Sequence, residues 1–312
     1  MPAILAIHGG AGTIRRETMT PQAEAAYHAG LRRALLAGHA VLAAGGSALD
    51  AVTQAVVALE DDPLFNAGHG AVYTSAGQHE LDAAVMEGAT REAGAVAGIL
   101  GPRHPILAAR AVLASEHVML HGRGAEDFAR AQGVAFAPSA HFHTDRRWEA
   151  LQAELERRRQ TAEDTRDDAA KHGTVGAVAC DAAGNVAAAT STGGMTGKAP
   201  GRIGDCPVFG AGTWADNATC AVSATGHGEY FIRHAAAHEI ASRMRFLGES
   251  VDQAANLVVE ELGRIGGSGG LIAVDAAGNV SLPFNSSGMY RGVIGADGVP
   301  HTAIYREALR GA

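Results

Sequence analysis

One peptide bond, Gly173–Thr174, most limits how this chain can fold, because a polar segment ends there and an apolar strand begins. Residues 161–171 read Thr-Ala-Glu-Asp-Thr-Arg-Asp-Asp-Ala-Ala-Lys, whereas Val175 to Cys180 carries no charge. Glycine lets another group approach its carbonyl closely, and the adjacent threonine hydroxyl could attack that carbonyl. We therefore expect a flexible linker over 161–173 and a strand that starts at Thr174.

Cleavage of this bond would give Thr174 a hydroxyl and a free α-amine on the same residue. An α-amine has a pKa of about 7.7–8.0, against about 10.4 for lysine, so it can act as a general base near neutral pH. A threonine hydroxyl needs such a base to become a good nucleophile. The bond therefore predicts an enzyme that activates itself, although an isolated Gly-Thr pair more often marks a loop that enters a strand.

The composition limits the class of protein. The chain has 312 residues, 47% of them hydrophobic, which is enough for one large core or two modest ones. A net charge of −8 argues against nucleic-acid binding, and no apolar stretch reaches the length of a membrane span. Three cysteines without a Cys-x-x-Cys pair indicate a reducing compartment and no metal motif. We expect a soluble, cytoplasmic protein.

Strands and helices are predicted to come in runs rather than to alternate one for one. This order favours an α+β fold with antiparallel sheets over a doubly wound parallel fold. The pentapeptide Asp-Ala-Ala-Gly-Asn occurs at 181–185 and 275–279, each time as a hairpin signal. Strands are expected at 3–7, 72–74, 81–86, 93–100, 175–180, 186–189, 218–224 and 271–274, and helices at 21–44, 47–60, 105–116, 124–132, 146–160, 229–247 and 250–265.

Two polar clusters are expected near Thr174. The cluster at 190–194 follows a strand antiparallel to the one that begins at Thr174, so Thr192 could orient the nucleophile. The pair Thr225-Gly226 lies between a strand and a helix, where free N–H groups can stabilise an oxyanion. Each cluster taken alone is also typical of ordinary strand ends and helix caps.

Three further features carry weaker signals. Arg202 and Asp205 lie on a glycine-bounded loop, and together they match the α-carboxylate and α-ammonium of an amino acid. His234 and His238 are expected on one helical face, which suggests zinc only weakly because no third ligand is evident. The acidic loop from residue 59 to 70 is taken as solvated surface, with cation binding by its carbonyls as the alternative.

The motifs as a set resemble the plant-type L-asparaginases, also called isoaspartyl peptidases, over essentially the whole chain. These proteins are Ntn-hydrolases with an αββα sandwich, in which two stacked, mainly antiparallel sheets lie between helical layers. The motifs that carry the resemblance are His172-Gly-Thr-Val-Gly-Ala-Val178, Thr190-Ser-Thr-Gly-Gly-Met-Thr196, Pro200-Gly-Arg-Ile-Gly-Asp205, Thr225-Gly-His-Gly-Glu229, Gly266-Gly-Ser-Gly-Gly-Leu271, His8-Gly-Gly-Ala-Gly12 and Leu64-Phe-Asn-Ala-Gly68.

The resemblance implies a role for each matching position. It implies one domain, autocleaved into subunits 1–173 and 174–312, no catalytic cofactor, a structural sodium ion, and a homodimer of cleaved αβ heterodimers. That sodium ion reverses the surface interpretation of the loop after residue 59. The implied residues are Thr174 as nucleophile, Thr192 as its helper, Thr225 and Gly226 as oxyanion hole, Arg202, Asp205 and the Gly228 carbonyl as substrate ligands, Asn66 beside the nucleophile, and Leu59, Glu60, Asp62, Phe65, Ala67 and His69 as the sodium loop.

The implied reaction is hydrolysis of L-asparagine and of β-aspartyl (isoaspartyl) dipeptides. His227 and Cys206 are modest departures from the family pattern, and neither removes a functional group. The alternatives are a glycosylasparaginase, a threonine endopeptidase, and a binding protein for amino acids that keeps the fold without maturing. The paired Arg202 and Asp205 favour small substrates over proteins.

Overall fold

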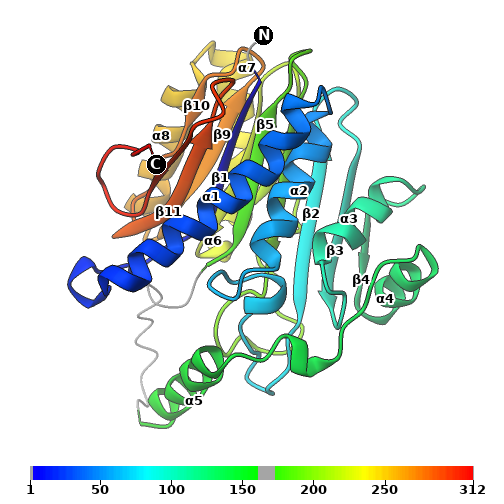
Figure 1. The fold of residues 1–312 in the computed structure, drawn as a ribbon, viewed down its shortest axis with the longest axis vertical. Helices are drawn as coiled ribbons and strands as arrows, with labels where there is room; N and C mark the ends of the chain where they lie inside the picture. Colours follow the sequence, from blue (N-terminus) through cyan, green and yellow to red (C-terminus); the bar gives the residue numbers. More distant parts are fainter. Residues whose placement is uncertain (1–2, 161–172, 312) are drawn as a thin grey trace.

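Two stacked β-sheets form the centre of the molecule, and helices cover the outer face of each (Figure 1). The computed structural model of the chain describes residues 3–160 and 173–311. The strands are β1 (Ile4–Gly12), β2 (Leu81–Glu87), β3 (Ala93–Ile99), β4 (Met119–His121), β5 (Val175–Cys180), β6 (Val186–Thr192), β7 (Thr213–Ala215), β8 (Cys220–Gly226), β9 (Gly269–Asp275), β10 (Val280–Ser281), β11 (Gly288–Ile294) and β12 (Pro300–Ala303).

The helices form the two outer layers. They are α1 (Pro21–Ala43), α2 (Ala48–Glu60), α3 (Pro105–Leu113), α4 (Gly122–Ala131), α5 (Asp145–Gln160), α6 (Gly228–Arg233), α7 (Ala236–Leu247) and α8 (Val251–Arg264). Figure 1 shows α1 and α2 crossing in front of the large sheet, with α5 set apart at the lower edge of the molecule. Helices α7 and α8 pack on the small sheet. The predicted α+β sandwich is therefore confirmed.

The large sheet interleaves strands from the two sides of the Gly173–Thr174 bond. Its order is β12-β11-β1-β5-β6-β2-β3-β4, and the small sheet runs β10-β9-β8-β7. Strand β1 lies between β11 and β5, antiparallel to both, and β2 pairs with β6. Only the β3–β4 pair is parallel among the described strands. Each part of the chain thus completes a sheet that the other part cannot form alone.

Strand periodicity explains which side chains reach the space between the sheets. Successive residues of a strand point to opposite faces. In β6, Ala187 and Ala189 pack with the α1 and α2 core, whereas Val186 and Ala188 pack against the small sheet. The same alternation assigns Ser191 to the helical side, and Thr190 and Thr192 to the side between the sheets.

The predicted helix starts are confirmed by their caps. Thr20 accepts a hydrogen bond from the Ala23 N–H at 3.2 Å, and Ser47 accepts one from the Asp50 N–H at 3.1 Å. Ser250 and Gln253 form a reciprocal capping box at the start of α8. These local interactions are readable from sequence because donor and acceptor are three residues apart.

Three element predictions were wrong. The expected strand at 72–74 makes only an isolated bridge between Thr74 and Lys198, because the Val72 N–H donates to the Asn66 side chain. The first strand continues through the glycines to Gly12. The expected helix over 229–247 is two helices, since Ala235 has φ 45° and the first N–H groups of α7 donate to carbonyls at 210–211. Strands β4, β7, β11 and β12 were not predicted.

Most of the predicted linker 161–173 lies outside the described residues. Gly173 is its one described member. In the part of the chain that is described, no helix combines the length and apolar character that crossing a membrane requires.

Candidate active site

Thr174 lies immediately before β5, in the space between the two sheets. Its side chain is 6% exposed, and the next residue, Val175, pairs with Ser191 of β6. The Thr174 hydroxyl donates to the Thr192 Oγ1 at 3.1 Å, and that oxygen also accepts the Gly194 N–H at 2.9 Å. The sequence argument that an antiparallel partner would bring Thr192 to Thr174 is therefore confirmed.

Gly173 packs between strand β1 and Asn66. A Cβ on Gly10, whose φ is 110°, would lie 2.6 Å from the Gly173 Cα, so only glycine fits beside the Gly173–Thr174 bond. The Asn66 amide donates to the Gly194 carbonyl at 2.7 Å, and its oxygen accepts the Val72 N–H at 2.9 Å. Asn66 is thus fixed next to the bond that the proposed cleavage would break.

A buried histidine holds the main chain of Thr174. His8 Nδ1 lies 3.0 Å from the Thr174 carbonyl oxygen, and His8 Nε2 lies 3.0 Å from the Ser223 hydroxyl. Burial lowers the pKa of His8 to about 3, so the ring is neutral at physiological pH. A carbonyl can only accept, so Nδ1 carries the proton and Nε2 accepts from Ser223.

This contact continues as a chain of hydroxyl groups through the core. Ser223 lies 2.7 Å from the Thr190 hydroxyl, and Thr213 donates to Thr190 at 2.7 Å. Thr213 is also 3.0 Å from the carbonyl of Cys206. These three hydroxyl residues are fully buried. These close contacts run from the Thr174 carbonyl to the loop that carries Asp205, but Thr213 has one proton and can donate to only one of Thr190 and the Cys206 carbonyl at a time.

The predicted oxyanion residues occupy the end of β8. The Thr225 hydroxyl accepts the Ala11 N–H at 3.2 Å, one residue after the glycine that contacts Gly173. Gly226 has φ 151°, and a Cβ there would lie 2.4 Å from the Ser268 carbonyl oxygen. The structure therefore brings this pair to the same end of the sheets as Thr174.

Arg202 and Asp205 converge at Gly228. A Cβ on Gly228 would lie 2.7 Å from Asp205 Oδ1 and 3.1 Å from Arg202 Nη2, so the missing side chain leaves room between the two charges. Burial raises the pKa of Asp205 to about 7, and its Oδ2 has no hydrogen-bond partner among the described residues. A carboxyl group in that state is suited to a cationic ligand.

The Arg202 guanidinium is oriented by a carboxylate that the sequence analysis did not single out. Its Nε and Nη2 donate to the two oxygens of Glu229 at 3.0 and 2.9 Å. This pairing uses one edge of the guanidinium and leaves the Nη1 edge for another carboxylate. Glu229 belongs to the motif 225–229, but only the fold reveals its partner.

The loop after α2 is where the family resemblance implies a sodium ion. A Cβ on Gly68 would lie 2.6 Å from the Glu60 carbonyl oxygen, and one on Gly70 would lie 2.0 Å from the Phe65 carbonyl oxygen. Two main-chain oxygens thus lie against glycines of this loop, and carbonyl oxygens are ligands that a hard cation accepts. The Asp62 carboxylate is paired with Arg33 at 2.6 Å, so Asp62 would contribute its carbonyl.

The weak zinc hypothesis is not supported by the fold. His234 ends α6 and His238 lies in α7, beyond the break at Ala235, so the two rings do not share one helical face. Over 3–160 and 173–311, no group of three His, Cys, Asp or Glu side chains is arranged to hold a metal.

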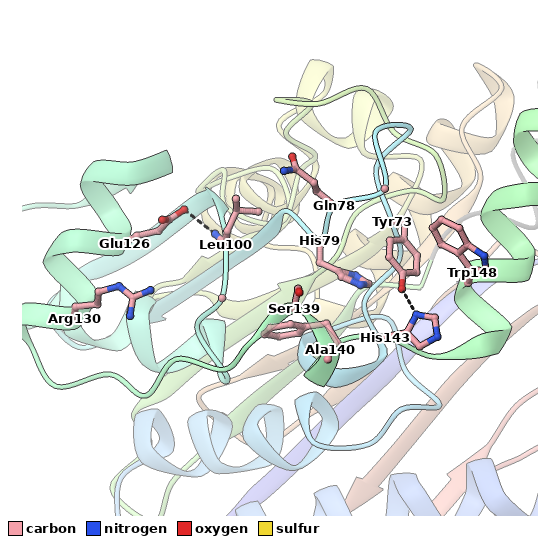
Figure 2. A pocket seen from close by; sticks show the side chains of 13 residues that line it. Tyr73, Gln78, His79, Leu100, Glu126, Arg130, Ser139, Ala140, His143 and Trp148 are labelled. Atoms are coloured by element: carbon pink, nitrogen blue, oxygen red, sulfur yellow. Dashed lines mark hydrogen bonds between the residues drawn. The ribbon is translucent and has the colours of Figure 1, made fainter.

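A cavity on another part of the molecule does not contain these residues. It measures about 690 Å³ and is walled largely by aromatic rings, including Tyr73, His79 and Trp148 (Figure 2). A smaller cavity of about 150 Å³ lies directly beside Gly173 and Asn66. The smaller cavity is the better candidate for the chemistry, because Gly173 and Asn66, which adjoin the predicted nucleophile, line it.

Sequence reasoning missed Ser223 and gave His8 no role. A signal for Ser223 was present, since Ser223 and Thr225 alternate with apolar residues in β8 and therefore share a face. No comparable signal connects His8 to Thr174, which is 166 positions away.

Comparison with known proteins finds relatives that align over nearly the whole chain. A family model described as asparaginase matches residues 1–304. The isoaspartyl peptidase of Salmonella typhimurium is 54% identical over 310 residues, which cover 98% of this chain and 99% of that protein. The isoaspartyl peptidase of Escherichia coli is 53% identical, with 98% and 97% covered. The isoaspartyl peptidase/L-asparaginase of Homo sapiens is 42% identical over 293 residues, with 93% and 92% covered.

Proposed function

The chain belongs to the asparaginase family, and on that basis we propose that it is a hydrolase of L-asparagine and β-aspartyl dipeptides with Thr174 as its nucleophile. The observation that carries the proposal is the hydroxyl of Thr174, held 3.1 Å from Thr192 directly after Gly173. A nucleophile hydroxyl in contact with an orienting group is the expected arrangement for covalent catalysis.

The first step is self-cleavage. The Thr174 hydroxyl attacks the Gly173 carbonyl carbon, the peptide bond to Thr174 N breaks, and an ester joins the two residues. Water then hydrolyses this ester to a Gly173 carboxylate and a free Thr174 hydroxyl. The products are an α subunit, 1–173, and a β subunit, 174–312. The freed α-amine has a pKa suited to general-base catalysis.

The second reaction is hydrolysis of the substrate, and it uses the same Thr174 hydroxyl as nucleophile. The α-amine accepts the Thr174 hydroxyl proton while the oxygen attacks the side-chain carbonyl of the aspartyl group. The amine then protonates the leaving nitrogen, which departs as ammonia or as an amino acid. Water hydrolyses the aspartyl ester, and aspartate is released. Thr225 and Gly226 are proposed to stabilise the oxyanion of each tetrahedral intermediate.

Recognition of the aspartyl group is assigned to the space at Gly228. Arg202 would bind the α-carboxylate through its Nη1 edge, while Asp205 and the Gly228 carbonyl would bind the α-ammonium. The support is the convergence of Arg202 Nη2 and Asp205 Oδ1 on the missing Gly228 side chain. Both charges of a free amino acid are then matched, which disfavours an internal residue of a protein substrate.

Three further assignments belong to the same proposal. A sodium ion would be held by main-chain oxygens of the loop at 59–69 and would fix the position of Asn66. The cleaved heterodimer would pair as a homodimer. The protein would act in the cytoplasm, in keeping with three buried cysteines that form no disulfide.

Intact mass measurement of the purified protein tests the proposal directly. We expect two fragments, of 173 and 139 residues, the smaller beginning with Thr174. Thr174→Ala should remain a single chain without hydrolase activity, because the attacking oxygen is absent. Thr174→Ser keeps a hydroxyl and should still be cleaved. Efficient cleavage of Thr174→Ala would contradict the mechanism.

A further inference from the structure

The cavity beside Gly173 is lined by a positively charged side chain, Arg147, which has no role in the proposed reaction. The cavity measures about 150 Å³ and lies between β1, the loop that carries Asn66, and the start of α5. Its lining residues include Gly9, Gly10, Gly12, Asn66, Gly173, Tyr27, Tyr290 and Arg147. Among the described residues of this lining, only Arg147 is positively charged.

Arg147 has no anionic partner in the part of the chain that is described. Its Nε donates to the Gly70 carbonyl at 2.8 Å, and no described acceptor contacts its two Nη groups. Burial and the charge of Arg146 lower its pKa to about 10, so Arg147 remains protonated at neutral pH. A partly buried guanidinium whose two Nη groups contact no described acceptor is suited to a carboxylate, which it can bind at two points.

The neighbouring arginine is already committed to protein groups. Arg146 donates to the Tyr27 hydroxyl at 2.7 Å and to the carbonyls of Pro63 and Leu64 at 3.1 and 2.8 Å. Arg146 does not line the cavity. The two arginines therefore differ in what they can bind, although they are adjacent in the sequence.

The proposed mechanism places the leaving group on the Gly173 side of the nucleophile. The Thr174 α-amine must come within about 2.6–3.2 Å of the leaving nitrogen to protonate it. Before cleavage this amine is bonded to Gly173, so it faces the volume that Gly173 occupies and the adjoining cavity. The aspartyl group lies elsewhere, because Arg202 and Asp205 meet at Gly228.

We infer that this cavity is the subsite for the residue released from β-aspartyl dipeptides, and that Arg147 binds the α-carboxylate of that residue. Tyr27 and Tyr290, whose rings stack at 4.1 Å, form an apolar wall for its side chain. L-Asparagine releases ammonia and leaves the subsite empty. Arg147 is therefore a specificity residue that favours dipeptides, and this role depends on the proposed function of Thr174.

Three substrates separate the role of the leaving carboxylate from the rest of the reaction. These are β-aspartyl-leucine, its amide β-aspartyl-leucinamide, which lacks that carboxylate, and L-asparagine. In the parent enzyme we expect kcat/KM to be about tenfold or more higher for the acid than for the amide. Arg147→Met should remove this preference by raising KM for the acid, while the amide and L-asparagine change by about twofold or less. Arg147→Lys should retain part of the preference.

Arg146→Met is the matched control, because it removes an adjacent charge that does not line the cavity. Any loss it causes should be equal for the acid and the amide. An equal loss for both dipeptides in Arg147→Met would overturn the assignment. If that variant does not fold, a parent enzyme without preference for the acid over the amide overturns it equally. A parent that hydrolyses none of the three substrates would instead refute the proposed function.

Discussion

Thr174 is held by its carbonyl and its hydroxyl rather than by the chain before it. His8 binds the carbonyl, and Thr192 binds the hydroxyl. These two contacts would gain importance once the proposed cleavage makes Thr174 a chain terminus, because termini lose order unless they are tied down. We therefore expect His8 to be a positioning residue, since it contacts the proposed nucleophile only through main chain.

A pair of substitutions at His8 tests that role. His8→Asn keeps a donor near the position of Nδ1, whereas His8→Gln places its amide near Nε2 and leaves the Thr174 carbonyl without a partner. We expect His8→Gln to lower kcat by about 10- to 100-fold with little change in KM, because nucleophile geometry is lost. His8→Asn should lie much closer to the parent. Equal kcat in two equally stable variants would argue against the role.

Arg202 should matter for substrate and not for self-cleavage. Arg202→Met removes the group proposed to bind the α-carboxylate, so KM for L-asparagine and for β-aspartyl-leucine should both rise by about tenfold or more. The precursor has no such carboxylate at that position, so the two fragments should still form. Steady-state kinetics and intact mass measure the two effects separately, and a variant with unchanged KM would contradict the assignment.

At the scale of the strands, one glycine of β5 makes room for the polar chain between the sheets. A Cβ on Gly176 would lie 2.0 Å from the Ser223 hydroxyl and 2.5 Å from His8 Nε2. The two neighbouring strands and the small sheet surround this position. A glycine inside a strand often marks such a close approach.

Gly176→Ala should therefore lower the free energy of unfolding by about 1–3 kcal/mol, as overpacking of a close-packed core does, and should also lower kcat by displacing His8. Gly124→Ala is the matched control, since no atom lies within 4 Å of the new Cβ. In α4 the added methyl should be neutral or stabilising by up to about 1 kcal/mol. Urea unfolding of both variants measures the contrast.

Elements with local signals could be predicted from the sequence, and those defined by tertiary contacts could not. The caps at Thr20 and Ser47 act over three residues, so α1 and α2 were located correctly. Strand β7 has three residues and depends on pairing with β8, which no local pattern reports. In the site, Thr192 followed from strand pairing, whereas Arg147 reaches the cavity through the fold alone.

At the scale of the whole molecule, buried ionisable groups make stability depend on pH in opposite senses. The pKa of Asp205 is raised from 3.8 to about 7, so the native state holds its proton more tightly than the unfolded state. Rising pH between those values therefore lowers the free energy of unfolding. The pKa of His8 is lowered from 6.5 to about 3, so falling pH over that range also destabilises the native state.

Asp205→Asn should stabilise the fold while it impairs substrate binding. At pH 8 the buried Asp205 carboxylate of the parent is charged, which lowers the free energy of unfolding by about 1.4 kcal/mol for each unit of pKa shift. The variant should therefore melt at a higher temperature. The difference should shrink as pH falls toward 4, because Asp205 is then protonated in the native state and only partly ionised in the unfolded state. Asp127→Asn, at an exposed carboxylate, should give no such trend. A lower melting temperature for Asp205→Asn at pH 8 would contradict the expectation.

The interleaved order of the large sheet changes how the molecule can recover from unfolding. Strand β1 lies between β5 and β11, so after the proposed cleavage two separate polypeptides would have to meet to rebuild one sheet. The uncut precursor would fold by a first-order process, whereas the cut enzyme would refold by a second-order process whose yield depends on concentration. Self-cleavage would then make unfolding difficult to reverse. Active enzyme that unfolds at low concentration would refold inefficiently, although its precursor could refold at any concentration.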